Sequence, residues 1–156
     1  FIKGIGVSVM QIAIVVSRFN SVITEKQCQG ALEQLADMGI SKENISVSWV
    51  PGAVELPLIA KQYAMHKNVD AIICFGAVVR GETDHYEYVC QLAAKGCSEV
   101  ALTHNIPVIF GVLTTHTMEQ ALARVGGDAG HCGKEYAASA VEMAELMQSF
   151  KPVPVS

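Results

Sequence analysis

The chain is poor in charge and has no run of basic residues. Of its 156 residues, 17% are charged, and the formal net charge is −4 at pH 7. Because nucleic acids and acidic membrane surfaces are bound by clustered Lys and Arg, we expect neither as a partner. The longest apolar stretches reach about eleven residues, short of the ~20 that a membrane-spanning helix needs. The hydrophobic residues nevertheless make up 51% of the chain, enough for a substantial core.

The chain also lacks the spacing patterns that hold metals. No two cysteines form a C-x-x-C pair, and the histidines are scattered without an H-E-x-x-H pattern. We therefore expect no metal site. The odd number of cysteines predicts reduced, mostly buried thiols and a cytoplasmic protein. These cysteines are Cys28, Cys74, Cys90, Cys97 and Cys132.

Strand and helix patterns alternate along the chain, and no linker or repeat divides it. Apolar runs predict strands at 12–16, 69–79 and 107–113, and apolar residues that alternate with serine predict a strand at 45–49 with one face less buried. Helical spacing of apolar residues predicts a helix after each strand. Continuous apolar strands that alternate with helices are typical of a parallel sheet covered on both faces. The sequence therefore predicts an α/β fold, a flavodoxin-like three-layer sandwich, as a single domain over residues 1–156.

The N-terminal segment and the low charge both point to self-association. Residues 5–9, IGVSV, alternate apolar and small side chains, which predicts an extra strand that pairs with the edge of a neighbouring copy's sheet. A chain with few charged residues leaves apolar surface exposed as a monomer, and association buries it. We therefore expect an oligomer.

Polar and aromatic residues follow each predicted strand. They occupy 17–20 (SRFN), 51–55 (PGAVE), 80–85 (RGETDH) and 114–117 (TTHT). Right-handed crossovers bring the carboxyl ends of parallel strands to one edge of the sheet, where ligands of such folds bind. The sequence therefore predicts a ligand site at this edge.

The turn RGETDH combines a helix start with a proton-transfer group. Asp84 followed by Glu87 predicts a capped helix N-terminus, where unpaired backbone N–H groups bind anions and Gly81 lets them approach closely. His85 is expected in the first helical turn, where the positive helix end disfavours its protonated form and suits it to act as a base. From these residues alone, a functional His85 and a capping or surface histidine are equally well supported.

Five blocks of residues follow one another along the chain: Arg18–Asn20, Val50–Pro57, Gly76–His85, Phe110–Thr115 and Glu119–Arg124. Taken together and in order, these blocks resemble the lumazine synthase family, the 6,7-dimethyl-8-ribityllumazine synthases of riboflavin biosynthesis. The resemblance covers the chain from about residue 12 to residue 147. It implies condensation of 5-amino-6-(D-ribitylamino)uracil with 3,4-dihydroxy-2-butanone 4-phosphate, release of phosphate and water, and no metal or organic cofactor. It also implies pentamers with sites between adjacent subunits, which in many members close into 60-subunit icosahedral shells.

The same resemblance implies a role for individual residues. His85 matches the proton-transfer residue. Glu82, Thr83 and Arg124 match residues that bind the butanone phosphate. Phe19, Glu55 and His85 are expected from one subunit, and Phe110 and Arg124 from the next. The residues that match the uracil-binding positions are Phe19, Ala53, Val54, Glu55, Ala77, Val78, Val79 and Phe110.

Plainer roles remain open for several of these residues. Phe19 is alternatively a core aromatic, Glu55 a helix cap, and Arg124 a solvated helix charge. The ring of Phe110, inside a strand, is expected in the core. We interpret His66, His104 and His116 as surface residues.

One position departs from the family pattern. The family's Gly-Asn-Lys-Gly turn, whose lysine reaches the phosphate, reads Gly130-His-Cys-Gly133 here, with Cys132 at the lysine position. Lys134 or His131 either replaces that cation or is a spectator. A catalytically weakened shell or ligand-binding homologue, and an unrelated flavodoxin-like binding domain, are therefore kept as rival functions.

Overall fold

The computed structural model describes residues 6–82 and 84–152. Within this part of the chain, four parallel strands form the main sheet in the order β2-β1-β3-β4, which confirms the predicted flavodoxin-like α/β arrangement. The strands are β1 (Ile12–Ser17), β2 (Ile45–Val50), β3 (Ala71–Val79) and β4 (Val108–Thr115). The helices are α1 (Ser21–Asp37), α2 (Leu56–His66), α3 (Tyr86–His104), α4 (Met118–Ala123) and α5 (Cys132–Gln148).

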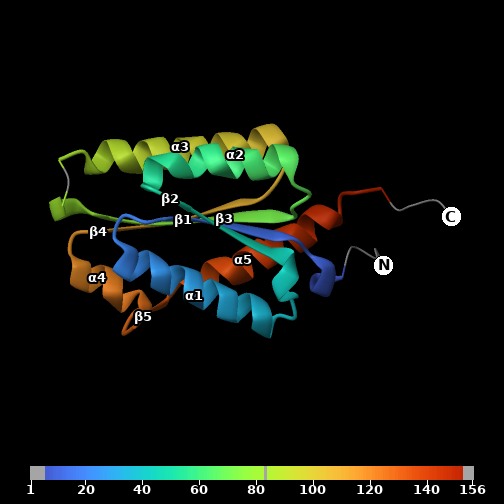
Figure 1. Ribbon diagram of the computed structural model, residues 1–156, viewed down its shortest axis with the longest axis horizontal. Coiled ribbons are helices and arrows are strands. Elements are labelled where there is room, and N and C mark those ends of the chain that lie inside the picture. Colours follow the sequence, from blue (N-terminus) through green and yellow to red (C-terminus); the bar gives the residue numbers. More distant parts are fainter. Residues whose placement is uncertain (1–5, 83, 153–156) are drawn as a thin grey trace.

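The two faces of the sheet are covered by different helices. Helices α2 and α3 lie on one face, and α1, α4 and α5 lie on the other (Figure 1). Side chains along a strand alternate between faces, so Ile14 and Phe75 join the core under α1 and α5, while Val15 and Cys74 join the core under α2 and α3. Strands β1 and β3 are therefore buried along their whole length, as their continuous apolar sequences predict.

Glycines allow close helix packing on both faces. A Cβ atom added to Gly133 of α5 would lie 2.2 Å from the carbonyl oxygen of Gln27 in α1. A Cβ atom on Gly96 of α3 would lie 2.5 Å from Cγ of Pro57 in α2. At both contacts the glycine lets its helix lie close to the neighbouring helix, and a larger residue there would push the two helices apart.

Two segments differ from the sequence prediction. An N-terminal strand was predicted over residues 5–9, but Val7–Val9 form a short 3-10 helix. Ile5 lies outside the described residues. The glycine-rich turn folds into a small hairpin, β5 (Val125–Gly127) with β6 (Gly130–His131). The positive φ angles of Gly126 (109°) and Gly130 (87°) explain why glycine stands at these positions.

Strand β2 forms one edge of the sheet and leaves apolar side chains uncovered. It pairs only with β1 among the described strands. Val47 is 38% exposed and Trp49 is 43% exposed. This chain alone does not bury the outer part of its own sheet, so a surface suited to association remains at that edge.

Candidate active site

The loops that follow the four strands meet at one end of the sheet, as predicted. The backbone N–H of Arg18 donates to the carbonyl of Val50 at 2.7 Å, and the N–H of Phe19 donates to the carbonyl of Pro51 at 3.1 Å. These bonds tie the loop after β1 to the loop after β2. Phe19 is thereby held at the sheet edge with its ring 49% exposed, which removes the alternative of a core aromatic.

A mostly apolar cavity of about 190 Å³ opens beside this ring. We call it the Phe19 cavity. It lies on the face of the sheet covered by α2 and α3, because its walls come from the ends of β1 and β3, the loop after β2, and α3. Its shape and lining suit a flat, partly apolar ring that stacks on an aromatic side chain. Its lining residues are Ser17, Phe19, Gly52, Ala53, Val54, Ala77, Val78 and Val89.

Asn20 fixes the position of the loop that carries Phe19. Its backbone has a φ of 59°, a left-handed conformation that asparagine tolerates better than most residues. Its side-chain Nδ2 donates to the carbonyl oxygen of Ala77 at 2.8 Å. This hydrogen bond joins the loop after β1 to the end of β3 at Ala77, which lines the Phe19 cavity.

Glu55 stands at the start of α2 and is half-buried. It occupies the N-cap position, but its side chain makes no capping hydrogen bond. Its Oε1 instead lies 3.3 Å from where a Cβ on Gly52 would be, beside a residue that lines the Phe19 cavity. The carboxylate is therefore not used as a helix cap.

The helix start after β3 differs from the expected capping arrangement. The N-cap of α3 is His85, and its side chain makes no capping hydrogen bond. Glu87, predicted to form a capping box with Asp84, instead pairs with Arg80 at 3.4 Å. The Arg80 guanidinium also lies 5.5 Å from the centre of the Tyr86 ring. Arg80 therefore contacts two side chains in the first turn of α3, Tyr86 and Glu87. The Asp84 prediction was wrong because a nearby arginine attracts the Glu87 carboxylate.

His85 is exposed at this turn, with its ring centre 6.4 Å from that of Tyr88. Glu82 ends a short 3-10 turn, Arg80–Glu82, and Thr83 lies outside the described residues. The predicted anion site in this turn, which needs Thr83, therefore stays a prediction.

A second cavity, of about 360 Å³, is lined by α4, the end of β4 and the hairpin after α4. We call it the Arg124 cavity. Helix α4 lies on the face of the sheet opposite α2 and α3 (Figure 1). Arg124 ends α4: its N–H donates to the carbonyl of Ala121 at 3.1 Å, and its own carbonyl accepts from the N–H of Cys132 at 2.7 Å. The backbone of this arginine is thus fixed on both sides. The lining residues are Thr114, Thr115, His116, Gln120, Ala123, Arg124 and Ala129.

The first turn of α4 fixes the other end of the Arg124 cavity. Thr117 and Gln120 form a capping box, in which the Thr117 side chain accepts from the N–H of Gln120 at 3.1 Å. The same Gln120 Oε1 accepts from the N–H of His116 at 2.9 Å. His116, interpreted from the sequence as a surface residue, is exposed and lies in the wall of this cavity.

Residues 131–134, which follow the hairpin turn, face α1 and do not line the Arg124 cavity. Cys132 is buried, with its sulfur 3.9 Å from Nε2 of Gln27. The His131 ring packs over Gly30, where an added Cβ would overlap it. Burial and the nearby Lys134 lower the pKa of His131. Lys134 pairs with Glu33 at 3.6 Å.

Phe110 and Val79 lie in neither cavity. Phe110 is a middle residue of β4, and its half-buried ring packs against the core under α2 and α3, as expected for a strand aromatic. Val79 is buried at the end of β3 and pairs with Thr115. If either residue contacts a ligand, main-chain groups must do so.

Several lining residues received no individual role from the sequence. Ser17, Gly52, Thr114, Thr115 and His116 lie in the segments predicted to form the ligand edge, so position after a strand could have identified them. Sequence reasoning missed the lining residues outside those segments, which lie in α3, α4 and the hairpin turn: Val89, Gln120, Ala123 and Ala129.

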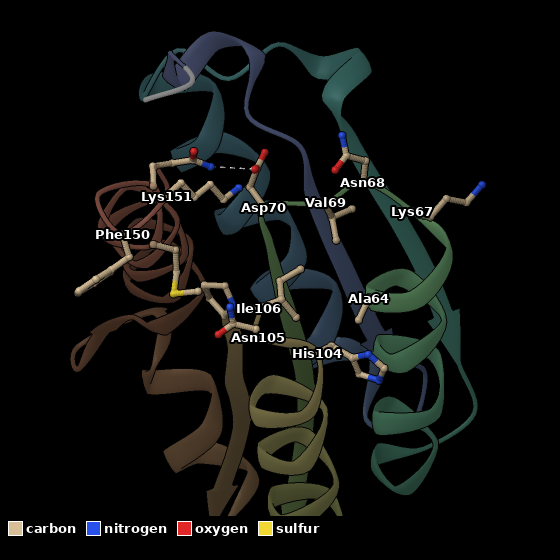
Figure 2. A pocket seen from close by; sticks show the side chains of 13 residues that line it. Ala64, Lys67, Asn68, Val69, Asp70, His104, Asn105, Ile106, Phe150 and Lys151 are labelled. Carbon is tan, nitrogen blue, oxygen red and sulfur yellow. Dashed lines mark hydrogen bonds between the residues drawn. The ribbon is translucent and has the colours of Figure 1, made fainter. Parts of the chain in front are cut away.

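A further cavity, of about 260 Å³, lies at the opposite end of the sheet, where the strands begin (Figure 2). Its central acid, Asp70, accepts hydrogen bonds from the Gln11 N–H at 2.8 Å and from Gln148 Nε2 at 3.3 Å. Lys67 and His104 lie where α2 and α3 end, where positive charge offsets the negative helix termini. The charged groups of this cavity thus already serve the fold, and we do not assign it a ligand.

All five cysteines are free thiols, and only Cys90 among them is not buried. Burial raises the pKa of the Cys28 thiol to about 11. Among the described residues, no group of three or more His, Cys, Asp or Glu side chains is placed to hold a metal ion. In the same part of the chain, no helix has the length and apolar character needed to span a bilayer.

Comparison with known proteins gives one consistent result. Residues 9–148 match the family model described as 6,7-dimethyl-8-ribityllumazine synthase. Relatives of that name from three strains of Coxiella burnetii, CbuG_Q212, RSA 493 and Dugway 5J108-111, are 51% identical to this chain over 144 residues. Each alignment covers 92% of this chain and 95% of the relative.

Proposed function

The chain belongs to the 6,7-dimethyl-8-ribityllumazine synthase family, and we propose that its active sites are formed by residues of two neighbouring subunits. It is a transferase of riboflavin biosynthesis. It condenses 5-amino-6-(D-ribitylamino)uracil with 3,4-dihydroxy-2-butanone 4-phosphate and forms 6,7-dimethyl-8-ribityllumazine, with release of phosphate and water. An amine of the uracil forms an imine with the ketone of the butanone and releases a first water, phosphate is then eliminated, and the second ring closes with loss of a second water.

The Phe19 cavity is the proposed site for the uracil substrate. The half-exposed Phe19 ring offers a stacking surface, and the apolar walls from Ala53, Val54, Ala77 and Val78 fit the edge of a flat heterocycle. Main-chain groups of Val79 at the end of β3, and of Phe110 within β4 of the neighbouring subunit, are proposed to provide donors and acceptors for the ring. Glu55, which makes no capping bond, is free to accept hydrogen bonds from the ribityl hydroxyls.

His85 is the proposed proton-transfer residue. It stands at the exposed start of α3, close to the α3 residue Val89 that closes the Phe19 cavity. Imine formation and ring closure both require protons to move between nitrogen and oxygen atoms, a task that an imidazole performs near neutral pH. Ring stacking by Phe19 holds the amine in place while this transfer occurs.

The Arg124 cavity is the proposed site for the phosphate of the butanone substrate. A guanidinium binds phosphate oxygens through two parallel N–H bonds, and the fixed backbone of Arg124 reduces the entropy lost on binding. Glu82 and Thr83 are proposed to contact the same substrate from the turn after β3.

One observation carries the proposal of shared sites. The Phe19 and Arg124 cavities have no lining residue in common, and the helices that contribute to them, α3 and α4, lie on opposite faces of the sheet (Figure 1). The two substrates must nevertheless meet within bonding distance. A neighbouring subunit that brings its Arg124 cavity to the first subunit's Phe19 cavity satisfies this requirement.

We extend this to the quaternary structure. The chain acts as one domain in a cytoplasmic homopentamer, in which the exposed Val47 and Trp49 of β2 are covered, and twelve pentamers form a 60-subunit icosahedral shell. The test is mass measurement of the native protein together with turnover of both substrates, followed through the lumazine chromophore. A shell or pentamer without turnover would favour the rival function, a catalytically weakened shell homologue. The observation that supports this rival is the buried Cys132, which stands where the family has a lysine. Monomers at working concentration would contradict the shared site.

A further inference from the structure

The Arg124 cavity has a second residue that can bind an anion. Of the residues in its wall, only His116 and Arg124 have ionisable side chains. Glu119 and Asp128, carboxylates of α4 and of the hairpin turn, do not line it. The cavity therefore holds two potential donors of positively charged N–H groups and no carboxylate that would repel an anion.

The other nearby cations are used elsewhere. Lys134 pairs with Glu33 on α1, and the His131 ring packs over Gly30 of the same helix. Cys132 is buried against Gln27. The glycine-rich turn therefore gives the Arg124 cavity no second cation, although that is where the sequence suggested one.

His116 is held in a position suited to this task. Its backbone N–H is bonded to Gln120 Oε1 at 2.9 Å, and the next residue, Thr117, is fixed by the α4 capping box. The side chain is exposed, and its imidazole nitrogens take part in none of the hydrogen bonds or ion pairs among the residues that the structure describes. An imidazole offers one N–H donor when neutral and two, with a positive charge, when protonated, so both forms can bind a phosphate oxygen.

We infer that His116 is a second phosphate-binding residue, which together with Arg124 holds the phosphate group of the butanone substrate. The inference rests on the proposed function of the Arg124 cavity. Because one donor is an imidazole and not a lysine, phosphate binding at this site depends more on the positions of the N–H groups than on a permanent positive charge. Inorganic phosphate, which leaves after the imine has formed, should bind to the same pair.

The test compares four variants of the assembled enzyme: His116→Ala, His116→Lys, Arg124→Ala and, as a control, His66→Ala. His66 is an exposed histidine at the far end of α2. Three quantities are measured: the KM for the butanone phosphate, the KM for the uracil substrate, and the inhibition constant of inorganic phosphate. For His116→Ala, which removes the N–H donor, we expect the first and third to rise about tenfold, as for the loss of one hydrogen bond to a charged group, and the second to change less than about twofold. His116→Lys, which keeps an N–H donor, should bind phosphate nearly as the wild type does, and His66→Ala should match the wild type.

Each other outcome has one meaning. If His116→Ala binds phosphate normally while Arg124→Ala does not, the inference about His116 is wrong and the proposed phosphate site stands. If neither variant affects phosphate, the proposed function of the whole cavity fails as well. If His116→Ala and His116→Lys both raise the two KM values equally, His116 only supports the fold, which also overturns the inference.

Discussion

Replacing Arg124 with alanine distinguishes a site completed by a neighbouring subunit from a site open to water. In the single chain Arg124 is exposed at the end of α4. An ion pair in such a setting contributes ~0–1 kcal/mol, so its loss would weaken phosphate binding by less than about fivefold. If a second subunit covers the cavity, the pair is desolvated and its loss costs ~2–5 kcal/mol, which corresponds to ~30-fold to ~5,000-fold.

The variant should fold, because the interactions that fix this position are those of the backbone. The N–H of Arg124 bonds to Ala121 and its carbonyl bonds to Cys132, and both bonds survive truncation of the side chain. The assay is the steady-state KM for the butanone phosphate, measured beside the KM for the uracil substrate. We expect a loss of at least ~30-fold in the first and little change in the second.

Lys134→Ala is the matched control, since it removes a cation close in sequence that pairs with Glu33 and lies outside the cavity. Side-chain exposures of 44% and 52% for this pair predict a change in stability of ~0–1 kcal/mol and no selective effect on phosphate. An Arg124→Ala loss below fivefold, or an equal loss in Lys134→Ala, would refute the reasoning.

Two further predictions concern the chemistry and the core. His85→Ala should slow lumazine formation by ~10²–10⁴-fold, the usual contribution of a general acid–base group, less any rate of the uncatalysed reaction; unchanged single-turnover rates would remove His85 from the mechanism. Gly133→Ala should lower the free energy of unfolding by ~1–3 kcal/mol, because the added Cβ would lie 2.2 Å from the Gln27 carbonyl oxygen and force α1 and α5 apart. The comparison is denaturant unfolding at fixed protomer concentration, with Gly81→Ala, where a Cβ meets nothing within 4 Å, as the control; equal stability of the two variants would contradict it.

The architecture was predictable because its signals are local and strong. Continuous apolar runs identified β1 and β3, and the alternation in β2 identified a strand but not its covered side chains, because Val47 and Trp49 are exposed. The meeting of the loops at one edge then followed from the handedness of parallel crossovers. The resemblance to a known family added roles for individual residues, which the fold by itself does not provide.

The details that could not be predicted depend on contacts between distant segments. Glu87 was expected to cap α3, but Arg80, seven residues earlier, holds its carboxylate. Lys134 was a candidate phosphate ligand, but Glu33 on α1 pairs with it. His116 was interpreted as a surface residue because nothing in its local sequence shows that β4 and α4 enclose a cavity beside it. Pattern reasoning identifies elements well, while the partner of a charged side chain is decided by tertiary packing.

The central claim is that two subunits build each active site, and subunit mixing tests it most directly. His85→Ala and Arg124→Ala proteins, each nearly inactive, are unfolded together and reassembled, with mass measurement to confirm that mixed oligomers form. Some interfaces then place an intact His85 beside an intact Arg124 from a neighbour, so lumazine formation should return to a substantial fraction of the wild-type rate. If the mixed oligomers form but remain as inactive as the separate variants, the two residues act within one chain and the shared site is wrong.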